Sequence, residues 1–548
     1  MSKTAYFHGN IITAAPDNRV ADGLFVRDGR ILAVGGREEI LSLADGDTEL
    51  IDLEGKTMLP GFIDPHGHIT AVAQTMLLLD FSGCGSIGEV QEVIRQKLRD
   101  DPPKEGEWVL GFGYDNTRFA GQAHPTKFDL DPISCRIPIL ITHASGHLAA
   151  ANTAALEKLG YTGENYTVPE GGAVRTVSPG SREPNGILEE NACLAPEKKA
   201  LIPGPSPERF LEALGKAQEL YASCGVTTAQ DASIDRNLHS LLLAAAEAGK
   251  LTLDIVGHAV QQDAFALLKD EGTPKREYTG HYKLLGGKTW LDGSPQGKTA
   301  WLTQPYLEPP EGESPDYRGY GTQSDGEVTE FMAGCLERNV QLNAHVNGDA
   351  AADQFLRCLK MATEKVKPSK ETRPVMVHAQ TVREDQLDEM KALGVIPTFF
   401  LDHIWYWGDY HCESVLGPER ASRISPAASA LKRGIVFTLH QDPPVKMPDP
   451  ILAIHNAVNR KTQKGRVLGE DQRISVMDAI RAVTINGAFQ YFEEDLKGSL
   501  EPGKYADLVI LDQNPLEVEP DRLKNIRVLE TVKEGKRVFK NMDKERNT

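Results

Sequence analysis

The sequence lacks the features of several classes of protein. No stretch approaches the roughly 18 uninterrupted apolar residues of a membrane-spanning helix, and the start, MSKTAYFHGNIITAAPDN, has no apolar core long enough for a signal peptide. The seven cysteines are odd in number and contain no CxxC pair, which indicates free thiols in a reducing compartment. No basic block offsets the formal net charge of −18, which disfavours binding to nucleic acid or to an anionic membrane. We therefore expect a cytoplasmic protein.

The middle of the 548-residue chain has one recurring pattern, in which short apolar strands alternate with amphipathic helices. This alternation predicts a parallel sheet covered by helices. Over this length the α/β fold that we expect is a (β/α)8 TIM-like barrel. The predicted strands cover 137–142, 225–230, 253–257, 340–345, 374–378, 394–400 and 434–439, and the predicted helices cover 208–223, 237–249, 326–338 and 383–392.

The two ends of the chain differ from the middle and resemble each other. Residues 4–13, 23–26 and 31–35 predict strands joined by turns, and so do residues 501–512 and 526–539. We expect residues 1–56 and 495–548 to form one small composite β-sandwich domain, because chain termini often lie close together. The barrel domain would then span 57–494.

A long segment at about 80–205 interrupts the predicted barrel. It is too long for one connection between elements, carries its own helix at 88–100, and is rich in Gly, Asn and Pro turns. We expect an insertion over the barrel mouth that acts as a lid.

The stretch LPGFIDPHGH at 59–68 ends in two histidines one residue apart. Its apolar start predicts a short strand, and alternate residues of a strand point the same way, so His66 and His68 would project together past Gly67. Two converging imidazoles are candidate metal ligands. An isolated HxH is also compatible with two ordinary loop histidines.

More ligand-type side chains stand where predicted strands end. His345 ends the strand at 340–345, His378 ends the strand at 374–378, and His440 and Asp442 follow the strand at 434–439. Catalytic residues of such barrels collect at the carboxyl ends of the strands, so these distant residues share one structural position with His66. The coincidence predicts a metal site.

Several motifs, taken together, resemble the amidohydrolase superfamily, in the "amidohydrolase 3" branch that includes N-substituted formamide deformylase. The likeness covers nearly the whole chain. Two motifs depart from the usual pattern, with Val377 in place of Glu and Gln441 in place of Ser. The matching segments are GFIDPHGH, KTWLDGSPQGKTA at 288–300, HVNGDAA at 345–351, VHAQ at 377–380, LHQDPPVKMPDP at 439–450 and GSLEPGKYADLVILD at 498–512.

The resemblance implies a ligand set, which consists of His66, His68 and Asp442 on one metal, His345 and His378 on a second, and a CO₂-carboxylated Lys288 between them. Zn²⁺ suits imidazole and carboxylate ligands, and Mn²⁺ or Fe²⁺ also fits. Lys283 is the second choice for the bridging lysine, because it lacks the four-residue offset to Asp292. Whether the site holds one metal or two remains open. The resemblance also implies a homodimer.

Three further residues are predicted to contact the substrate. His147 lies in SGHLAAANTAAL, which resembles a D-G-H segment of the branch, and we expect it to make a polar contact. The spacing of His143 and His147 would also suit a zinc pair on a helix, which Gly146 argues against. Trp405, in FLDHIWYWGDYH, would either wall an apolar pocket or pack beneath a loop. Tyr114 would reach the site from the insertion.

The implied activity is metal-dependent hydrolysis of a carbon–nitrogen bond in a small molecule, such as an amide, formamide or cyclic amide. Asp442 would accept the proton of the attacking water and pass it to the leaving nitrogen. The same site could instead attack an ester, a lactone or a phosphotriester. A non-catalytic scaffold on this fold is the other alternative, which the complete ligand set disfavours.

Overall fold

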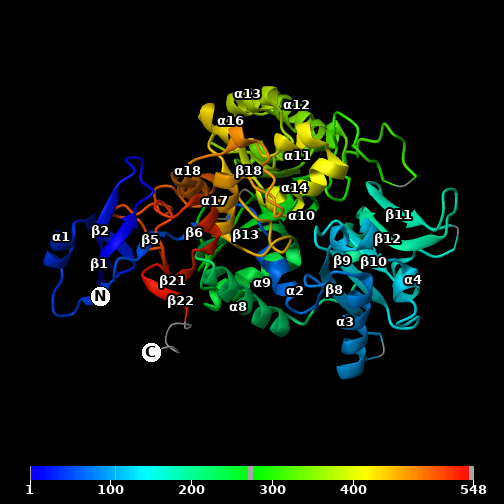
Figure 1. Cartoon of the computed structure of the whole chain (residues 1–548), viewed down its shortest axis with the longest axis horizontal. Coiled ribbons are helices and arrows are strands. Elements are labelled where there is room, and N and C mark those ends of the chain that lie inside the picture. Colours follow the sequence, from blue (N-terminus) through cyan, green and yellow to red (C-terminus); the bar gives the residue numbers. More distant parts are fainter. Residues whose placement is uncertain (1, 105, 164, 270–275, 311, 542–548) are drawn as a thin grey trace.

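The central element is a parallel sheet of eight strands that follow one another in chain order and curl into a TIM-like barrel (Figure 1). We describe it from a computed structural model, which covers residues 2–541 apart from 105, 164, 270–275 and 311. The predicted α/β fold with a parallel barrel sheet is confirmed. The strands are β6 (Phe62–Ile63), β13 (Val226–Ile234), β14 (Asp254–Val260), β15 (Tyr282–Trp290), β16 (Gln341–Val346), β17 (Val375–His378), β18 (Ile396–Phe399) and β19 (Thr438–Leu439).

Two differences separate the predicted strands from the barrel sheet. The strand predicted at 137–142 is wrong as a barrel strand, because it becomes β9 (Ile139–His143) in a separate sheet. The prediction lacked β15, whose sequence YKLLGGKTW contains two glycines that weaken a strand pattern. The first of them is required by close approach, since a Cβ on Gly286 would come within 2.0 Å of the carbonyl oxygen of Gln341 on β16.

Helices cover the outside of the barrel (Figure 1). Their starts follow N-cap chemistry: the Ser206 side chain accepts from the Arg209 N–H before α8, and Ser324 and Glu327 form a capping box before α11. The apolar faces of these helices and of the strands form the largest hydrophobic core. None of the helices in the described ranges is both long enough and apolar enough to span a bilayer. The main outer helices are α8 (Pro207–Ser223), α9 (Arg236–Glu247), α11 (Asp325–Glu337), α12 (Asp349–Lys365), α13 (Glu384–Leu393) and α17 (Pro450–Asn459).

A second sheet joins the two ends of the chain at one end of the molecule (Figure 1). Its order is β22-β21-β20-β5-β1-β2-β3, with β4 on β1, and the antiparallel pair β5–β20 joins the N-terminal and C-terminal strands. The division of the chain at residues 56 and 495 stays a prediction. The strands are β1 (Lys3–Ile12), β2 (Val20–Arg27), β3 (Arg30–Gly35), β4 (Glu49–Asp52), β5 (Thr57–Pro60), β20 (Leu508–Leu511), β21 (Val528–Lys533) and β22 (Lys536–Lys540).

A buried group of charges ties this second sheet to the barrel. Asp254 at the start of β14 pairs with Lys497 and lies 2.7 Å from Nζ of Lys533 on β21. Lys283 on β15 pairs with Glu493 at 2.6 Å. Nδ1 of His281 also lies 2.7 Å from Asp254, so the Asp254 carboxylate already has three partners and is a salt-bridge centre rather than a metal ligand. Lys283 is engaged here and not at the barrel rim.

The segment at about 80–205 forms a six-stranded sheet of its own with the order β11-β12-β10-β9-β8-β7, on the side of the barrel opposite the second sheet (Figure 1). Its helix α3 (Ile87–Asp100) is capped by Ser86, close to the predicted helix at 88–100. Its own hydrophobic clusters stabilise it. The strands are β7 (Leu79–Asp80), β8 (Val109–Tyr114), β9, β10 (Leu148–Ala151), β11 (Gly172–Thr176) and β12 (Pro184–Glu190).

Candidate metal centre

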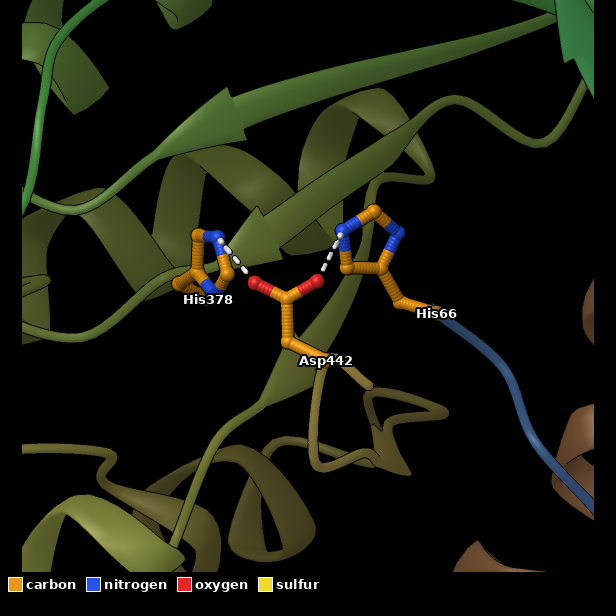
Figure 2. A group of neighbouring side chains, drawn as sticks. All are labelled: His66, His378 and Asp442. Atoms are coloured by element: carbon orange, nitrogen blue, oxygen red, sulfur yellow. Dashed lines mark ion pairs between the residues drawn. The ribbon is translucent and has the colours of Figure 1, made fainter. Parts of the chain in front are cut away.

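The carboxylate of Asp442 lies between the imidazoles of His66 and His378 (Figure 2). Its Oδ1 is 3.4 Å from Nε2 of His66 and 3.3 Å from Nε2 of His68, and its Oδ2 is 3.8 Å from Nε2 of His378. Asp442 follows β19, and His66 follows β6, the strands at the two ends of the barrel sheet. The contacts between them therefore meet where the curled sheet closes.

A neighbouring strand orients His66. Its Nδ1–H donates to Oε1 of Gln230 on β13 at 2.7 Å, which leaves Nε2 facing Asp442. His66 and His68 both lie beyond the end of β6. The hydrogen bonds of the turn therefore set the directions of their side chains, and the alternation of a β-strand does not. The backbone N–H of His68, for example, donates to the carbonyl of Pro443 at 2.8 Å.

His345 and His378 approach each other at the ends of the adjacent strands β16 and β17. Nδ1 of His345 is 3.1 Å from Nε2 of His378. Nε2–H of His345 donates to the carbonyl of Gly293 at 3.1 Å, so its Nδ1 carries the lone pair. With zinc–nitrogen bonds of about 2.1 Å, tetrahedral ligands lie about 3.4 Å apart, so this spacing is close to that of two ligands of one cation.

His440 supports His378 from behind. Nδ1 of His378 lies 3.0 Å from Nε2 of His440, and Nδ1 of His440 lies 3.0 Å from the hydroxyl of Thr398. If His378 donates this hydrogen bond to His440, Nε2 of His378 presents a lone pair toward Nδ1 of His345. Such a partner on the second ring nitrogen is the usual way to orient a metal-bound histidine.

The electrostatics of the group suit a divalent cation. Burial lowers the pKa of His66, His345 and His378 well below the usual value, so these imidazoles are neutral. Burial raises the pKa of Asp442, but His66 and His68 lower it more strongly, and the net pKa lies far below its usual range. Neutral imidazoles around a carboxylate are already in the protonation state that metal binding requires.

Lys288 on β15 lies beside this group, fully buried, with its Nζ 3.5 Å from Nε2 of His66. No carboxylate in the described ranges pairs with it. Burial lowers the pKa of Lys288 to about 7, against a weaker opposing effect of Asp442. Asn343, its partner in register on β16, is buried with neither side-chain polar atom hydrogen-bonded within the described chain. An unpaired lysine and an unsatisfied amide on one face of the sheet fit an additional polar group there.

His147, from the insertion, contacts this group through its ring, which lies 5.1 Å from the ring of His345. Its Nδ1 is 2.8 Å from Oε2 of Glu190, and the hydroxyl of Thr299 donates to the other oxygen of Glu190 at 2.9 Å. Burial lowers the pKa of His147, but the charge and hydrogen bond of Glu190 raise it above the usual value. Glu190 has φ 47° and ψ −125°, an uncommon backbone conformation for a residue other than glycine.

Two residues that were predicted to contact the substrate have contacts elsewhere in the structure, and their roles stay predictions. Tyr114 is buried inside the insertion, where its hydroxyl is 3.2 Å from Nδ1 of His124. Trp405 lies on α14 (Asp402–Tyr410), with its ring 5.6 Å from that of His455 and 4.3 Å from Nζ of Lys524. It therefore packs against neighbouring segments, in keeping with the second interpretation of its sequence.

Other residues of α14 and its start approach the group instead. The Phe400 ring lies 5.1 Å from that of His440 and 4.7 Å from that of His403. His403 and Trp407 are four residues apart on one helical face, with rings 4.9 Å from each other. Trp405 is two residues away from both His403 and Trp407. It therefore lies on a different face of the helix.

The helical zinc pair of His143 and His147 is wrong. His143 ends β9, His147 precedes β10, and a turn separates them. Oδ1 of Asp292 lies 3.7 Å from Nε2 of His345. The Asp292 carboxylate also accepts from the backbone N–H groups of Asn347, Gly348 and Trp301. It shapes the turn that presents the Gly293 carbonyl to His345.

Sequence reasoning placed His440 among the ligand-type side chains at strand ends, without a role of its own, and it did not find Gln230 or Glu190. Gln230 and Glu190 carried no signal, because each acts through a contact with a histidine more than 40 positions away in the chain.

Comparisons with known proteins agree with this geometry. A sequence model of the amidohydrolase family matches residues 49–539. The chain is 27% identical over 542 residues to N-substituted formamide deformylase of Arthrobacter pascens, with 96% of each chain covered. It is 26% identical over 552 residues to YtcJ of Bacillus subtilis (strain 168), covering 98% of this chain and 99% of that protein. An uncharacterized metal-dependent hydrolase of Pyrococcus horikoshii OT3 has a TM-score of 0.74 at 25% identity, covering 95% of this chain and 99% of that one.

Proposed function

The chain belongs to the amidohydrolase family, and we propose that it is a metal-dependent hydrolase that cleaves a carbon–nitrogen bond in an amide, a formamide or a cyclic amide. One observation carries the proposal. Nδ1 of His345 and Nε2 of His378 face each other at 3.1 Å beside the Asp442 carboxylate, while their other ring nitrogens have partners elsewhere. The likeness to a formamide deformylase supports the choice of a carbon–nitrogen bond.

The site would hold one or two divalent cations, with Zn²⁺ favoured by the imidazole-rich donor set and Mn²⁺ or Fe²⁺ as alternatives. When bound, such cations supply a hydroxide nucleophile at neutral pH and polarise a carbonyl oxygen. Lys288 would take part as a CO₂-derived carbamate, which its burial, its lack of a carboxylate partner in the described chain and its lowered pKa support. The proposed ligands are His66, His68, Lys288, His345, His378 and Asp442.

Asp442 would accept a proton from the attacking water and deliver it to the departing nitrogen, because an amine leaves readily only after protonation. Its carboxylate is ionised and lies within 3.4 Å of two histidines, at the place where the water would be activated. His147, with Nδ1 held by Glu190, would offer Nε2 to the substrate.

Metal analysis combined with a substrate panel tests this function. Protein purified without chelator should contain near-stoichiometric metal and should hydrolyse at least one formamide, N-acyl amine or cyclic ureide faster than a matched ester. If the protein hydrolysed only esters or lactones, the bond that it cleaves would be an ester bond and not a carbon–nitrogen bond. A metal-free protein without turnover would support the scaffold alternative.

We keep four further predictions as proposals. Residues 1–56 and 495–548 would form a β-sandwich domain, and the insertion at about 80–205 would act as a lid over the site. The protein would act on a small molecule in the cytoplasm and form a homodimer, which sedimentation in solution would test.

A further inference from the structure

Lys446 lies in the loop between β19 and α17, four residues beyond Asp442. The loop is turned back on itself, since the N–H of Val445 donates to the carbonyl of Asp442 at 2.8 Å. The half-buried Lys446 side chain lies over α14, with Nζ 3.8 Å from the ring centre of Tyr406 and 4.9 Å from that of Trp407. The ammonium group therefore has an aromatic floor.

The ammonium group has no ion-pair partner in the described part of the chain, although a partly desolvated charge normally has one. Burial lowers the pKa of Lys446, and the charges of Asp115 and Asp402 offset this only from a distance. Both carboxyl groups have other partners. Asp402 accepts from Asn456 at 2.6 Å, and Asp115 accepts from the hydroxyl and the N–H of Thr117 in its own turn. The three N–H donors of Lys446 remain available.

The position of Lys446 connects it to the candidate metal centre. Burial lowers the pKa of His143 in the insertion and of His403 on α14, and the positive charge of Lys446 lowers both further. The ammonium group lies over Tyr406 and Trp407 of α14, the helix that follows the barrel strand β18. The buried rings of Phe400, His403 and Trp407 connect His440 to this ammonium through successive contacts.

We propose that Lys446 binds a carboxylate group of the substrate, so that the enzyme acts on amides that carry a carboxylate at the end that points away from the metal centre, toward α14. This inference rests on the proposed function. Lys446 would pair with the charged end of such a substrate. A charge-assisted hydrogen bond at a partly desolvated site is strong enough to set specificity.

A matched substrate pair tests the proposal, namely 4-(2-formamidoethyl)benzoate and N-formylphenethylamine, which differ only in a carboxylate at the end of the molecule far from the formamide. Lys446→Met should raise KM for the carboxylated compound about 10- to 100-fold and change KM for the neutral one less than about twofold. Lys446→Arg should restore most of the difference. Lys524→Met is the control, because Lys524 lies over Trp405 on the other side of the same helix and should affect neither substrate.

Equal effects of Lys446→Met on both compounds, or no wild-type preference for the carboxylated one, would overturn the proposal. If neither compound is hydrolysed, that result counts against the proposed function, and calorimetric binding of the same pair to the metal-loaded protein then decides about Lys446. Weaker binding of the carboxylated compound alone to Lys446→Met would uphold the proposal, and equal binding would refute it. The unfolding midpoint of each variant would show that the fold is retained.

Discussion

Nε2 of His378 lies 3.1 Å from Nδ1 of His345, although strand register does not pair these residues. His345 is opposite Val377, so on a regular strand His378 would point to the other side of the sheet. His378 has φ 70° and the following Ala379 has φ 44°, and this left-handed turn at the strand end directs the imidazole toward His345. A cation held between these two nitrogens would accept the lone pair of each.

His378→Ala should therefore weaken metal binding by at least about 100-fold, because it removes one of the two facing nitrogens. Inductively coupled plasma mass spectrometry after dialysis against a weak chelator measures the loss. The control is His8→Ala, which removes an exposed histidine paired with Asp52 in the second sheet. Full metal occupancy in His378→Ala would contradict the proposed ligand set.

Asp442→Asn should lower kcat by about 10²- to 10⁴-fold, the usual contribution of a positioned general acid–base group. Asparagine is the appropriate replacement because residue 442 has φ 55°, a conformation that Asn tolerates better than most residues. An unchanged unfolding midpoint would show that the fold is intact. Near-normal turnover would remove Asp442 from the proton transfer.

Activity should depend on CO₂ through Lys288. Its pKa is about 7, so above pH 7 the amine is mostly neutral and can react with CO₂, whereas below pH 7 it is mostly protonated. After incubation in CO₂-free acidic buffer with a chelator, bicarbonate plus metal should restore activity faster at pH 8 than at pH 6. A carbamate signal in ¹³C NMR with labelled bicarbonate, absent in Lys288→Met, would identify the group. Full recovery without bicarbonate would exclude the carbamate.

Glu190→Gln should lower kcat/KM by about 10- to 100-fold, because it removes the charge that holds His147 while retaining the size of the side chain. Glu190→Ala should lower kcat/KM further, since it also leaves the Thr299 hydroxyl without the carboxylate that accepts its hydrogen bond. The neighbouring Glu189→Gln is the matched control, because Glu189 pairs with Arg175 instead. Equal losses in Glu189→Gln and Glu190→Gln would indicate a general effect on the insertion.

Lys497→Met should reduce the free energy of unfolding by about 3–5 kcal/mol, because it leaves buried charges at Asp254 and Glu493 with fewer partners. The exposed pair of Lys461 and Asp521 supplies the control, for which Lys461→Met should cost about 1 kcal/mol or less. Urea unfolding measures both. A loss no larger than that of the control would show that this buried centre contributes little to stability.

The same buried centre predicts a pH dependence of stability. Burial raises the pKa of Asp254, but Lys497 and Lys533 lower it more, so that its pKa in the folded protein lies well below the unfolded value of about 4. Its contribution is therefore fully present above about pH 4 and is lost as the pH falls further. In Lys497→Met this acid-dependent loss should be smaller, which unfolding curves between pH 3 and 6 would show.

Much of the fold could be read from local patterns. Hydrophobic runs located most barrel strands, and the strand-end positions of His345 and His378 pointed to one rim. The local patterns failed where contacts between segments far apart in the chain determined the structure. Gly286 weakened the signal of β15 although its lack of a side chain is what lets β15 and β16 approach. The run at 137–142 is as apolar as a barrel strand, and only its partners place it in the insertion.

The amino-acid sequence alone was enough to indicate the parallel α/β architecture and the histidines and aspartate of the rim, because periodicity and residue chemistry are local properties. Folding in three dimensions was needed to show which ring nitrogens of His345 and His378 face each other, which aromatic residues of α14 lie nearest the centre, and that Glu190 supports His147. These features depend on hydrogen bonds and backbone turns between segments far apart in the chain. No pattern within one segment encodes them.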